Sequence, residues 1–400
     1  MKTAKPLARL QDVAAINPPL SAVPATDEVV SFLPMSAVDA EEVEAVDGET
    51  RLFNEVSKGY TPFIFDDVLV AKITPCFENG KIAQAKPTRR FGFGSTEFHV
   101  IRPHVNDLDP RYLVHFLRQE RVRKDGERKM TGSAGQRRVP EHFLANLRLP
   151  LPPLLEQRRI AAILDKADEL RRKRRAALAK LDRLTQSIFL DMFGDPATNP
   201  KGWSEIACLG EVADIVSGIT KGRQLNGKTT RVVPYLAVIN VQDRALNLAT
   251  VKTIEATEEE IRRYRLQKGD LLLTEGGDPD KLGRGTLWDN ELPECIHQNH
   301  VFRVRLTSDA VEPTFLEWLI GSTRGKRYFL RSAKQTTGIA TINMTQLRSF
   351  PLLLPPVELQ RRFATRLAEI DLVGAAQRNS LSRFDDAFAS LQHRAFRGEL

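Results

Sequence analysis

The segment Leu149-Pro150-Leu151-Pro152-Pro153-Leu154-Leu155-Glu156-Gln157-Arg158-Arg159-Ile160 returns 203 residues later as Leu352-Leu353-Leu354-Pro355-Pro356-Val357-Glu358-Leu359-Gln360-Arg361-Arg362-Phe363. Both copies run directly into a long helical pattern. A repeat of this length exceeds the roughly 20–50 residues of solenoid units. The spacing therefore predicts two similar domains, each followed by a helix.

Short matches at or near the same spacing extend the repeat into the globular blocks. Asp67–Val70 matches Asp270–Leu273, Asp109–Leu113 matches Glu312–Leu316, and Thr131-Gly132-Ser133 is set against Thr337-Gly338-Ile339. Apolar runs bounded by turn residues predict strands: 61–65, 68–73, 98–101, 232–241, 270–274 and 300–304. Helices are expected after Asp109-Pro110 and over 313–320.

These patterns predict a mixed α/β chain with globular blocks at 1–150 and 197–351 and long helices at 151–196 and 352–400. The Pro-Pro pair before each helix marks its start, because proline is tolerated in a first turn and not inside a helix.

Each long helix carries an apolar repeat of 3.5 residues, which is typical of a coiled coil. The predicted a positions are Ile160, Ala167, Arg174, Leu181 and Ile188, and then Phe363, Ile370, Gln377, Phe384 and Leu391. The predicted d positions are Ile163, Leu170, Ala177 and Leu184 in the first helix. In the second they are the weaker set Arg366, Val373, Ser380 and Ala387, supplemented at e by Leu367, Leu381 and Phe388.

The polar residues Arg174 and Gln377 break both stripes at the same central position. Either each points outward from its own helix, or the helices pair antiparallel and the two residues meet in one polar layer. Such a layer would fix the register, and the pairing would relate the domains by a pseudo two-fold. The adjoining cluster Arg171–Arg175 is either a solvated helix face or a patch near nucleic acid or an acidic partner.

Composition suits a globular protein that meets a polyanion. The chain has 400 residues, 42% of them hydrophobic, and a net charge of +8. Residues 81–138 hold 14 Lys/Arg and 6 Asp/Glu, whereas residues 27–49 hold eight acids and no Lys or Arg. Three dispersed cysteines, no apolar run of membrane length and no signal-peptide pattern lead us to expect a cytoplasmic protein.

Catalytic and metal motifs are weak. Asn17-Pro18-Pro19-Leu20 lacks the aromatic residue of amino-methyltransferases, and the glycines at 276–277 and 283–285 do not form a phosphate loop. Pro279-Asp280 is followed by no nuclease motif. Cys295, His297 and His300 have no second ligand pair at zinc spacing. We therefore expect neither a catalytic residue nor a metal in this chain.

Two basic loops are rich in the residue types that contact DNA in other proteins. The first is 128–138 and its counterpart is 331–343. Lys and Arg neutralise phosphates, whereas Arg, Gln and Asn read base edges. The candidate DNA-binding residues are Lys72, Lys81, Arg89, Arg90, Arg128, Lys129, Ser133, Gln136, Arg137, Arg138, Lys221, Arg223, Lys281, Arg284, Lys334, Gln335, Thr337 and Asn343. The alternative is a pair of flexible basic loops.

The chain resembles the specificity subunits of type I restriction-modification systems. The resemblance rests on the two Pro-Pro-x-x-x-Gln-Arg-Arg helix entries, the segment 190–196, Lys201-Gly202-Trp203, the segment 209–218 and the final Ala395–Leu400. It covers essentially the whole chain. Only the first residues match loosely, where 10–14 echoes 209–213.

This resemblance implies a function for each part. Each globular block would be a target-recognition domain that reads one half of a bipartite DNA site, and the antiparallel coil would set the spacing between half-sites. The coil would also bind two modification subunits that use S-adenosylmethionine, joined by restriction subunits that use ATP and Mg²⁺. The chain would hold no cofactor. A free-standing nuclease or methyltransferase and a protein-binding scaffold are the rival hypotheses.

Overall fold

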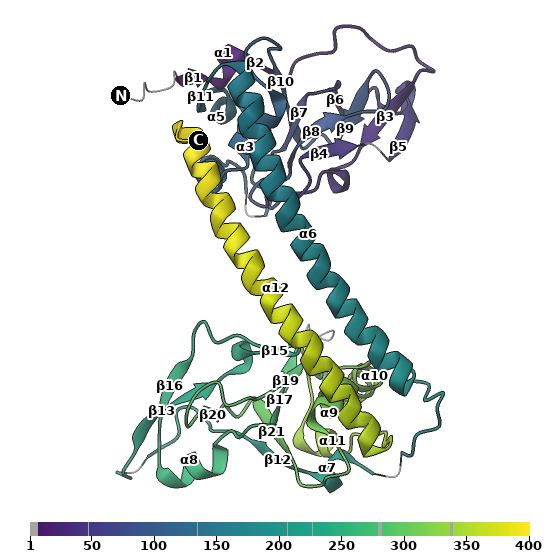
Figure 1. Cartoon of the computed structure of the whole chain (residues 1–400), viewed down its shortest axis with the longest axis vertical. Coiled ribbons are helices and arrows are strands. Elements are labelled where there is room, and N and C mark those ends of the chain that lie inside the picture. The colour runs from purple at the N-terminus through teal and green to yellow at the C-terminus, as the bar shows by residue number, and fades with distance from the viewer. Residues whose placement is uncertain are drawn as a thin grey trace. The chain divides into compact units, whose positions relative to one another are not determined.

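The computed structural model describes residues 7–46, 48–133, 135–205, 207–225, 227–278, 282–336 and 339–400. The chain divides into two compact units, residues 1–178 with 377–400 and residues 179–376 (Figure 1). The helices α6 (Leu154–Phe193) and α12 (Val357–Arg397) each contribute one part to each unit.

The first unit is built on a five-stranded sheet in the order β2-β10-β7-β8-β4 and a four-stranded sheet in the order β5-β3-β9-β6. Its strands are β1 (Leu7–Arg9), β2 (Ala14–Ile16), β3 (Val29–Leu33), β4 (Glu44–Val46), β5 (Glu49–Leu52), β6 (Thr61–Phe63), β7 (Val68–Ala71), β8 (Ile82–Lys86), β9 (Gly92–Gly94), β10 (Phe98–Pro103) and β11 (Arg148–Pro150). Its shorter helices are α1 (Leu10–Val13), η1 (Met35–Ala37), α2 (Phe53–Val56), α3 (Pro110–Leu117), α4 (Glu120–Lys129) and α5 (Glu141–Ala145).

The second unit repeats the central sheet as β12-β21-β17-β19 and adds three smaller sheets, β16-β13-β20, β14-β15 and β18-β23-β22. Its strands are β12 (Ala213–Ser217), β13 (Arg231–Leu236), β14 (Val241–Gln242), β15 (Ala245–Leu246), β16 (Lys252–Ala256), β17 (Leu271–Thr274), β18 (Gly276–Gly277), β19 (Gly285–Leu287), β20 (Ile296–His297), β21 (Val301–Leu306), β22 (Lys334–Thr336) and β23 (Ile339–Thr341). Its shorter helices are α7 (Leu209–Val212), η2 (Val238–Asn240), α8 (Glu258–Tyr264), α9 (Pro313–Ile320), α10 (Thr323–Ser332) and α11 (Met344–Arg348).

The duplication holds in three dimensions. The elements α3, α4, α5, β7 and β10 recur 203 residues later as α9, α10, α11, β17 and β21, whereas α1 and β2 recur 199 residues later as α7 and β12. The antiparallel pairing of β10 with β7 returns as the pairing of β21 with β17. The predicted mixed α/β fold with two similar domains is therefore confirmed.

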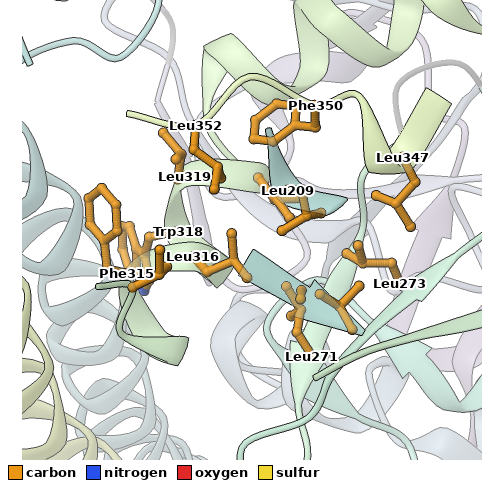
Figure 2. Packing of buried hydrophobic residues seen from close by; sticks show 14 of the residues in the cluster. Leu209, Leu271, Leu273, Phe315, Leu316, Trp318, Leu319, Leu347, Phe350 and Leu352 are labelled. Carbon is orange, nitrogen blue, oxygen red and sulfur yellow. The ribbon is translucent and has the colours of Figure 1, made fainter. Parts of the chain in front are cut away.

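Each unit buries its own core, and the long helices are part of it. In the second unit Phe189, Phe193 and Phe363 pack with Phe315 and Trp318, whose neighbours are shown in Figure 2. In the first unit Ile160, Leu164 and Phe396 pack with Tyr112 and Phe116. Each long helix thereby contributes side chains to the cores of both units.

Two details of the sequence prediction were wrong. The expected strand 232–241 stops at Leu236, because the Asn240 side chain accepts a hydrogen bond from the Ala237 N–H (2.9 Å) and the chain turns through η2. The match of 131–133 with 337–339 is three residues out of register. Thr131 bridges Arg138 and Lys334 pairs with Thr341, so the loops align at 203.

Candidate nucleic-acid interface

The two basic loops occupy equivalent places. Each follows a ten-residue helix, α4 or α10, and each closes on itself, through the Thr131–Arg138 bridge or the β22–β23 hairpin. Each also pairs with the second residue after a central strand, because Ile73 bridges Arg138 and Gly276 pairs with Thr341. The loops are thus mounted on the sheets in the same way.

Several predicted phosphate-binding cations are held by acids of the same domain. Arg138 makes a bidentate pair with Glu97 (2.7 and 2.9 Å), and these bonds hold the pKa of the Glu97 carboxyl below its usual range. Arg128 pairs with Asp125 at 3.1 Å. Arg137 lies 3.8 Å from Glu78 and 3.7 Å from Glu127. These pairs position the guanidinium groups, and a phosphate would compete with the carboxylates.

The other candidates of the first domain are spread along its strand ends. Lys72 follows β7, and no ion pair holds its ammonium group among the residues that the structure describes. Lys81 donates to the Met35 carbonyl at 3.1 Å. Arg89, Arg90, Lys129, Ser133 and Gln136 are exposed. The loop residues and Lys72 come together, because the Val139 N–H donates to the Lys72 carbonyl at 2.8 Å.

In the second domain Lys221 and Arg223 line an open groove of about 740 Å³ with Tyr235 and Glu255. Arg223 is paired with Glu260 at 2.5 Å, and Arg284 donates to Gln242 at 3.3 Å. The Asn343 side chain accepts from the Gln346 N–H (2.9 Å), so it caps α11. Lys281 and Thr337 lie outside the described residues, as do the side chains of Lys334 and Gln335 on β22.

The long helices pair antiparallel, as predicted. In the first unit Arg171 of α6 contacts Asp385 of α12 (2.6 Å), and in the second unit Phe189 packs on Phe363 with ring centroids 5.4 Å apart. An early part of α6 therefore meets a late part of α12, and a late part of α6 meets an early part of α12.

The buried seam agrees with the prediction at the a positions, which are at least partly buried in both helices, and differs at several d positions. The partners of the a positions lie four residues later, and three of them, Leu367, Leu381 and Phe388, were expected at e. These partners are Leu164, Arg171, Leu178, Thr185 and Met192 on α6, and Leu367, Gly374, Leu381, Phe388 and Ala395 on α12.

Leu170 and Leu184, two of the predicted d residues, are 38% and 46% exposed, and Ile163 is half-buried. For Leu170 and Leu184 the assignment to the coil seam is wrong. The polar residues Arg171 and Thr185 occupy the seam. The prediction placed the preceding leucine in the seam in each case, because it was based on hydrophobicity. Arg171 is satisfied there by Asp168 and Asp385, and its guanidinium lies 4.3 Å from the Phe388 ring centroid.

The central polar residues meet. Arg174 donates a hydrogen bond to the Gln377 side-chain oxygen within the first unit. Of the two alternatives, the structure shows the shared polar layer.

The basic cluster at 171–175 is largely neutralised within the chain. Arg172 pairs with Glu42, Arg175 pairs with Glu41 (3.0 Å), and Lys173 pairs with Glu169 (2.6 Å). The acidic segment of the first domain thus contacts the middle of α6. The cluster is neither a freely solvated face nor an unpaired basic patch.

The sequence analysis missed the role of the glutamine in each repeated helix entry. Gln157 and Gln360 are both fully buried. Each side-chain oxygen accepts from the N-cap N–H of the preceding domain helix, Asp109 or Glu312, at 2.9 Å. Each side-chain N–H₂ donates to two carbonyls, those of Asp107 and Pro152 or of Ala310 and Pro355. We call this arrangement the glutamine clamp. The sequence feature that could have indicated it is the glutamine at the same place in both repeated helix entries.

The histidines of the second domain have local partners. His297 is fully buried and its Nδ1 lies 2.7 Å from the Val301 carbonyl, whereas His300 pairs with Glu275. Burial lowers the pKa of His297 to about 4. Among the residues that the structure describes, no cluster of His, Cys, Asp and Glu could hold a metal, and no helix is long and apolar enough to cross a membrane.

The structure thus contains two similar α/β domains with equivalent basic loops, and a glutamine clamp joins each domain to a long helix. A family model described as the type I restriction modification DNA specificity domain matches residues 51–180 and 200–380. Because the match covers more than half of the sequence, the chain belongs to this family of type I restriction-modification specificity subunits.

Individual relatives agree. The chain is 24% identical to the EcoEI type I restriction enzyme specificity subunit of Escherichia coli, over 90% of this chain and 76% of that protein. It is 36% identical to the Escherichia coli EcoAI specificity subunit, over 45% of this chain but only 31% of that protein.

Solved structures share the fold. A structure whose description concerns the complex assembly and conformational transition of the type I R-M system matches with a TM-score of 0.57 at 21% identity. The match covers 100% of this chain and 99% of that chain. The type I restriction-modification S subunit of M. genitalium matches with a TM-score of 0.54 at 13% identity, covering 99% and 97%.

Proposed function

We propose that each domain of this specificity subunit reads one half of a bipartite, asymmetric DNA site. The observation that carries the proposal is the equivalent placement of the two loops, 128–138 and 331–343, on two clamped domains whose loop sequences differ. Because the two loops are attached to their domains in the same way, they meet DNA in the same manner. Their different side chains then select different bases.

The paired helices set the distance between the half-sites and dock two modification subunits. The support is the antiparallel seam, its central Arg174–Gln377 layer and the glutamine clamp that fixes each domain to its helix. The exposed Leu170 and Leu184 belong to the surface that remains for docking.

The chain is non-catalytic by itself. It holds no cofactor, and S-adenosylmethionine, ATP and Mg²⁺ act in the modification and restriction subunits. The complex works on double-stranded DNA in the cytoplasm.

The test is to sequence the methylated sites of cells that carry the chain with its modification partner. A two-part motif with a fixed gap is expected, and a single undivided motif would overturn the two-reader assignment. Binding of the complex to duplex DNA should also weaken steeply with added salt, because each phosphate contact releases counterions. A purified chain that methylated or cut DNA alone would support the enzyme hypothesis instead.

A further inference from the structure

Three positions beside each basic loop form the same backbone arrangement in both domains. In the first domain the Lys72 N–H donates to the Glu97 carbonyl (2.8 Å), and the Val139 N–H donates to the Lys72 carbonyl (2.8 Å). In the second domain the Glu275 N–H donates to the His300 carbonyl (3.0 Å), and the Ile342 N–H donates to the Glu275 carbonyl (2.9 Å).

We call the side chains that these bonds bring together a cradle. The first consists of Lys72, Glu97 and Arg138, which precedes Val139, and the second consists of Glu275, His300 and Thr341, which precedes Ile342; every member is 203 residues from its counterpart. The last member of each lies in the basic loop and pairs with the residue that follows the first member, Ile73 or Gly276.

The side chains of the two cradles have opposite chemistry. Lysine at 72 corresponds to glutamate at 275, and glutamate at 97 corresponds to histidine at 300. Because the backbone bonds are the same in both, the fold does not require either set. The side chains at these positions are therefore free to serve recognition.

The first cradle presents hydrogen-bond donors. Glu97 is already occupied by Arg138, which donates to both of its oxygens, and among the described residues no ion pair holds the Lys72 ammonium. Lys72 also borders a cavity of about 440 Å³ with Tyr60 and His99, which leaves room for a group to approach. An ammonium group has three donors and no acceptor.

The second cradle presents acceptors. The His300 Nδ1 lies 2.5 Å from one Glu275 oxygen, Oε2, and within the described part of the chain the other oxygen has no hydrogen-bond partner. Both side chains reach solvent, since Glu275 is 31% and His300 55% exposed.

We propose that the two cradles are specificity-determining sites, the first for the O6 and N7 acceptors of guanine and the second for the amino group of cytosine or adenine. Lysine donates to the acceptors on the guanine edge, whereas a carboxylate accepts from an exocyclic amino group. This inference rests on the proposed function, because it assigns base preferences to two domains taken to read separate half-sites.

Matched variants test the inference in the complete complex. Lys72→Gln and Glu275→Gln place the same neutral residue at the equivalent position of each domain. The readout is the methylated motif of cells that carry the full chain and its modification partner. Each variant should lower the preference at one base pair by on the order of 10-fold, and the two should affect different half-motifs.

The unchanged half-motif in each variant shows that the chain still folds and assembles. Lys72→Arg should keep the guanine preference, because arginine also donates to O6 and N7. Lys268→Met, which removes an exposed lysine outside both cradles, should leave the whole motif unchanged.

Three outcomes would overturn the assignment: both half-motifs unchanged in both variants, both half-motifs altered by one variant, or methylation lost altogether. A wild-type motif that is not divided into two parts would instead contradict the proposed function, which separates the two failures.

Discussion

At the scale of single residues, the buried glutamines explain why the helix entries repeat so closely. Gln157 and Gln360 each satisfy one N–H and two carbonyl groups where a domain meets its helix. No other side chain of that length offers one acceptor and two donors. The repeated motif is therefore a joint between domain and helix.

Replacing Gln157 by leucine should lower the free energy of unfolding by on the order of 3 kcal/mol, because the backbone groups that it satisfies are left buried without partners. Thermal or urea unfolding of the full chain measures this. Gln186→Leu, at an exposed position of the same helix, should change stability by less than about 0.5 kcal/mol. Equal losses in both variants would contradict the clamp.

The buried His297 and the partly buried Glu317 give the second unit opposite responses to pH. Burial raises the pKa of Glu317 to about 7 from 4.5, so its stabilising contribution is complete below pH 4.5 and is lost as the pH rises through 7. Burial lowers the pKa of His297 to about 4 from 6.5, so its contribution is present above pH 6.5 and is lost as the pH falls through 4. The two effects offset one another in the wild type.

Glu317→Gln should therefore remove the part of the pH dependence that comes from the glutamate. The amide oxygen keeps the acceptor for the Leu287 N–H, and the carboxylate that is costly to bury is gone. The melting temperature of the variant minus that of the wild type should increase from pH 5 to pH 8. The exposed Glu259→Gln is the control for loss of one charge, and a constant difference across this range would refute the assignment to Glu317.

At the scale of elements, leucines of α6 inside and outside the seam of the coiled coil differ in burial. Leu164 is fully buried, whereas Leu170 is 38% exposed. Leu164→Ala should destabilise the chain by about 2–5 kcal/mol, because it removes buried methyl groups and leaves a cavity. Leu170→Ala should cost roughly 0.5 kcal/mol or less. The free energy of unfolding, measured by urea denaturation, distinguishes the two variants. A larger loss for Leu170→Ala than for Leu164→Ala would support the predicted assignment of Leu170 to the seam.

The sequence predicted the elements that short-range patterns determine. Helix α9 begins and ends where Pro313 and Ile320 were expected to bound it, and the antiparallel pairing followed from the matched breaks at Arg174 and Gln377. The seam was displaced because polar residues occupy it. Arg171 pairs with Asp385, which only the fold brings near, and the Thr185 hydroxyl donates to the Asp182 carbonyl of its own helix.

The candidate DNA-binding residues were found by charge, and charge alone did not reveal their partners. Nothing near Arg138 in sequence indicated that Glu97, 41 residues away, would hold it. The cradles were missed for the same reason, because their members are separated along the chain and only strand pairing joins them.

At the scale of the whole molecule, the two units are not equally held. In the first unit Glu41 and Glu42 pair with Arg175 and Arg172 of α6. The residues of α12 that match Arg172 and Arg175 are Ala375 and Arg378, so only one of the two cations recurs. The second copy therefore lacks one of the two cations that form this electrostatic brace in the first unit.

Reversing the brace with Glu41→Lys and Glu42→Lys should speed amide hydrogen exchange in residues 38–46 and leave the second unit unchanged. Each exposed pair contributes only about 0–1 kcal/mol, so local opening is expected and not global unfolding. Glu49→Lys is the control, because Glu49 pairs only locally with Arg51. High salt should abolish the difference between variant and control, since it screens the pairs.

The division of each long helix between the units also sets an order of events during translation. Phe396 and Ala395 are buried in the core of the first unit, beside Tyr112 and Phe116. At about 5–20 residues per second, residues 377–400 leave the ribosome roughly 10–45 s after residue 178. The domain that is synthesised first is thus the last to be completed, and until then a chaperone has an open apolar surface to cover.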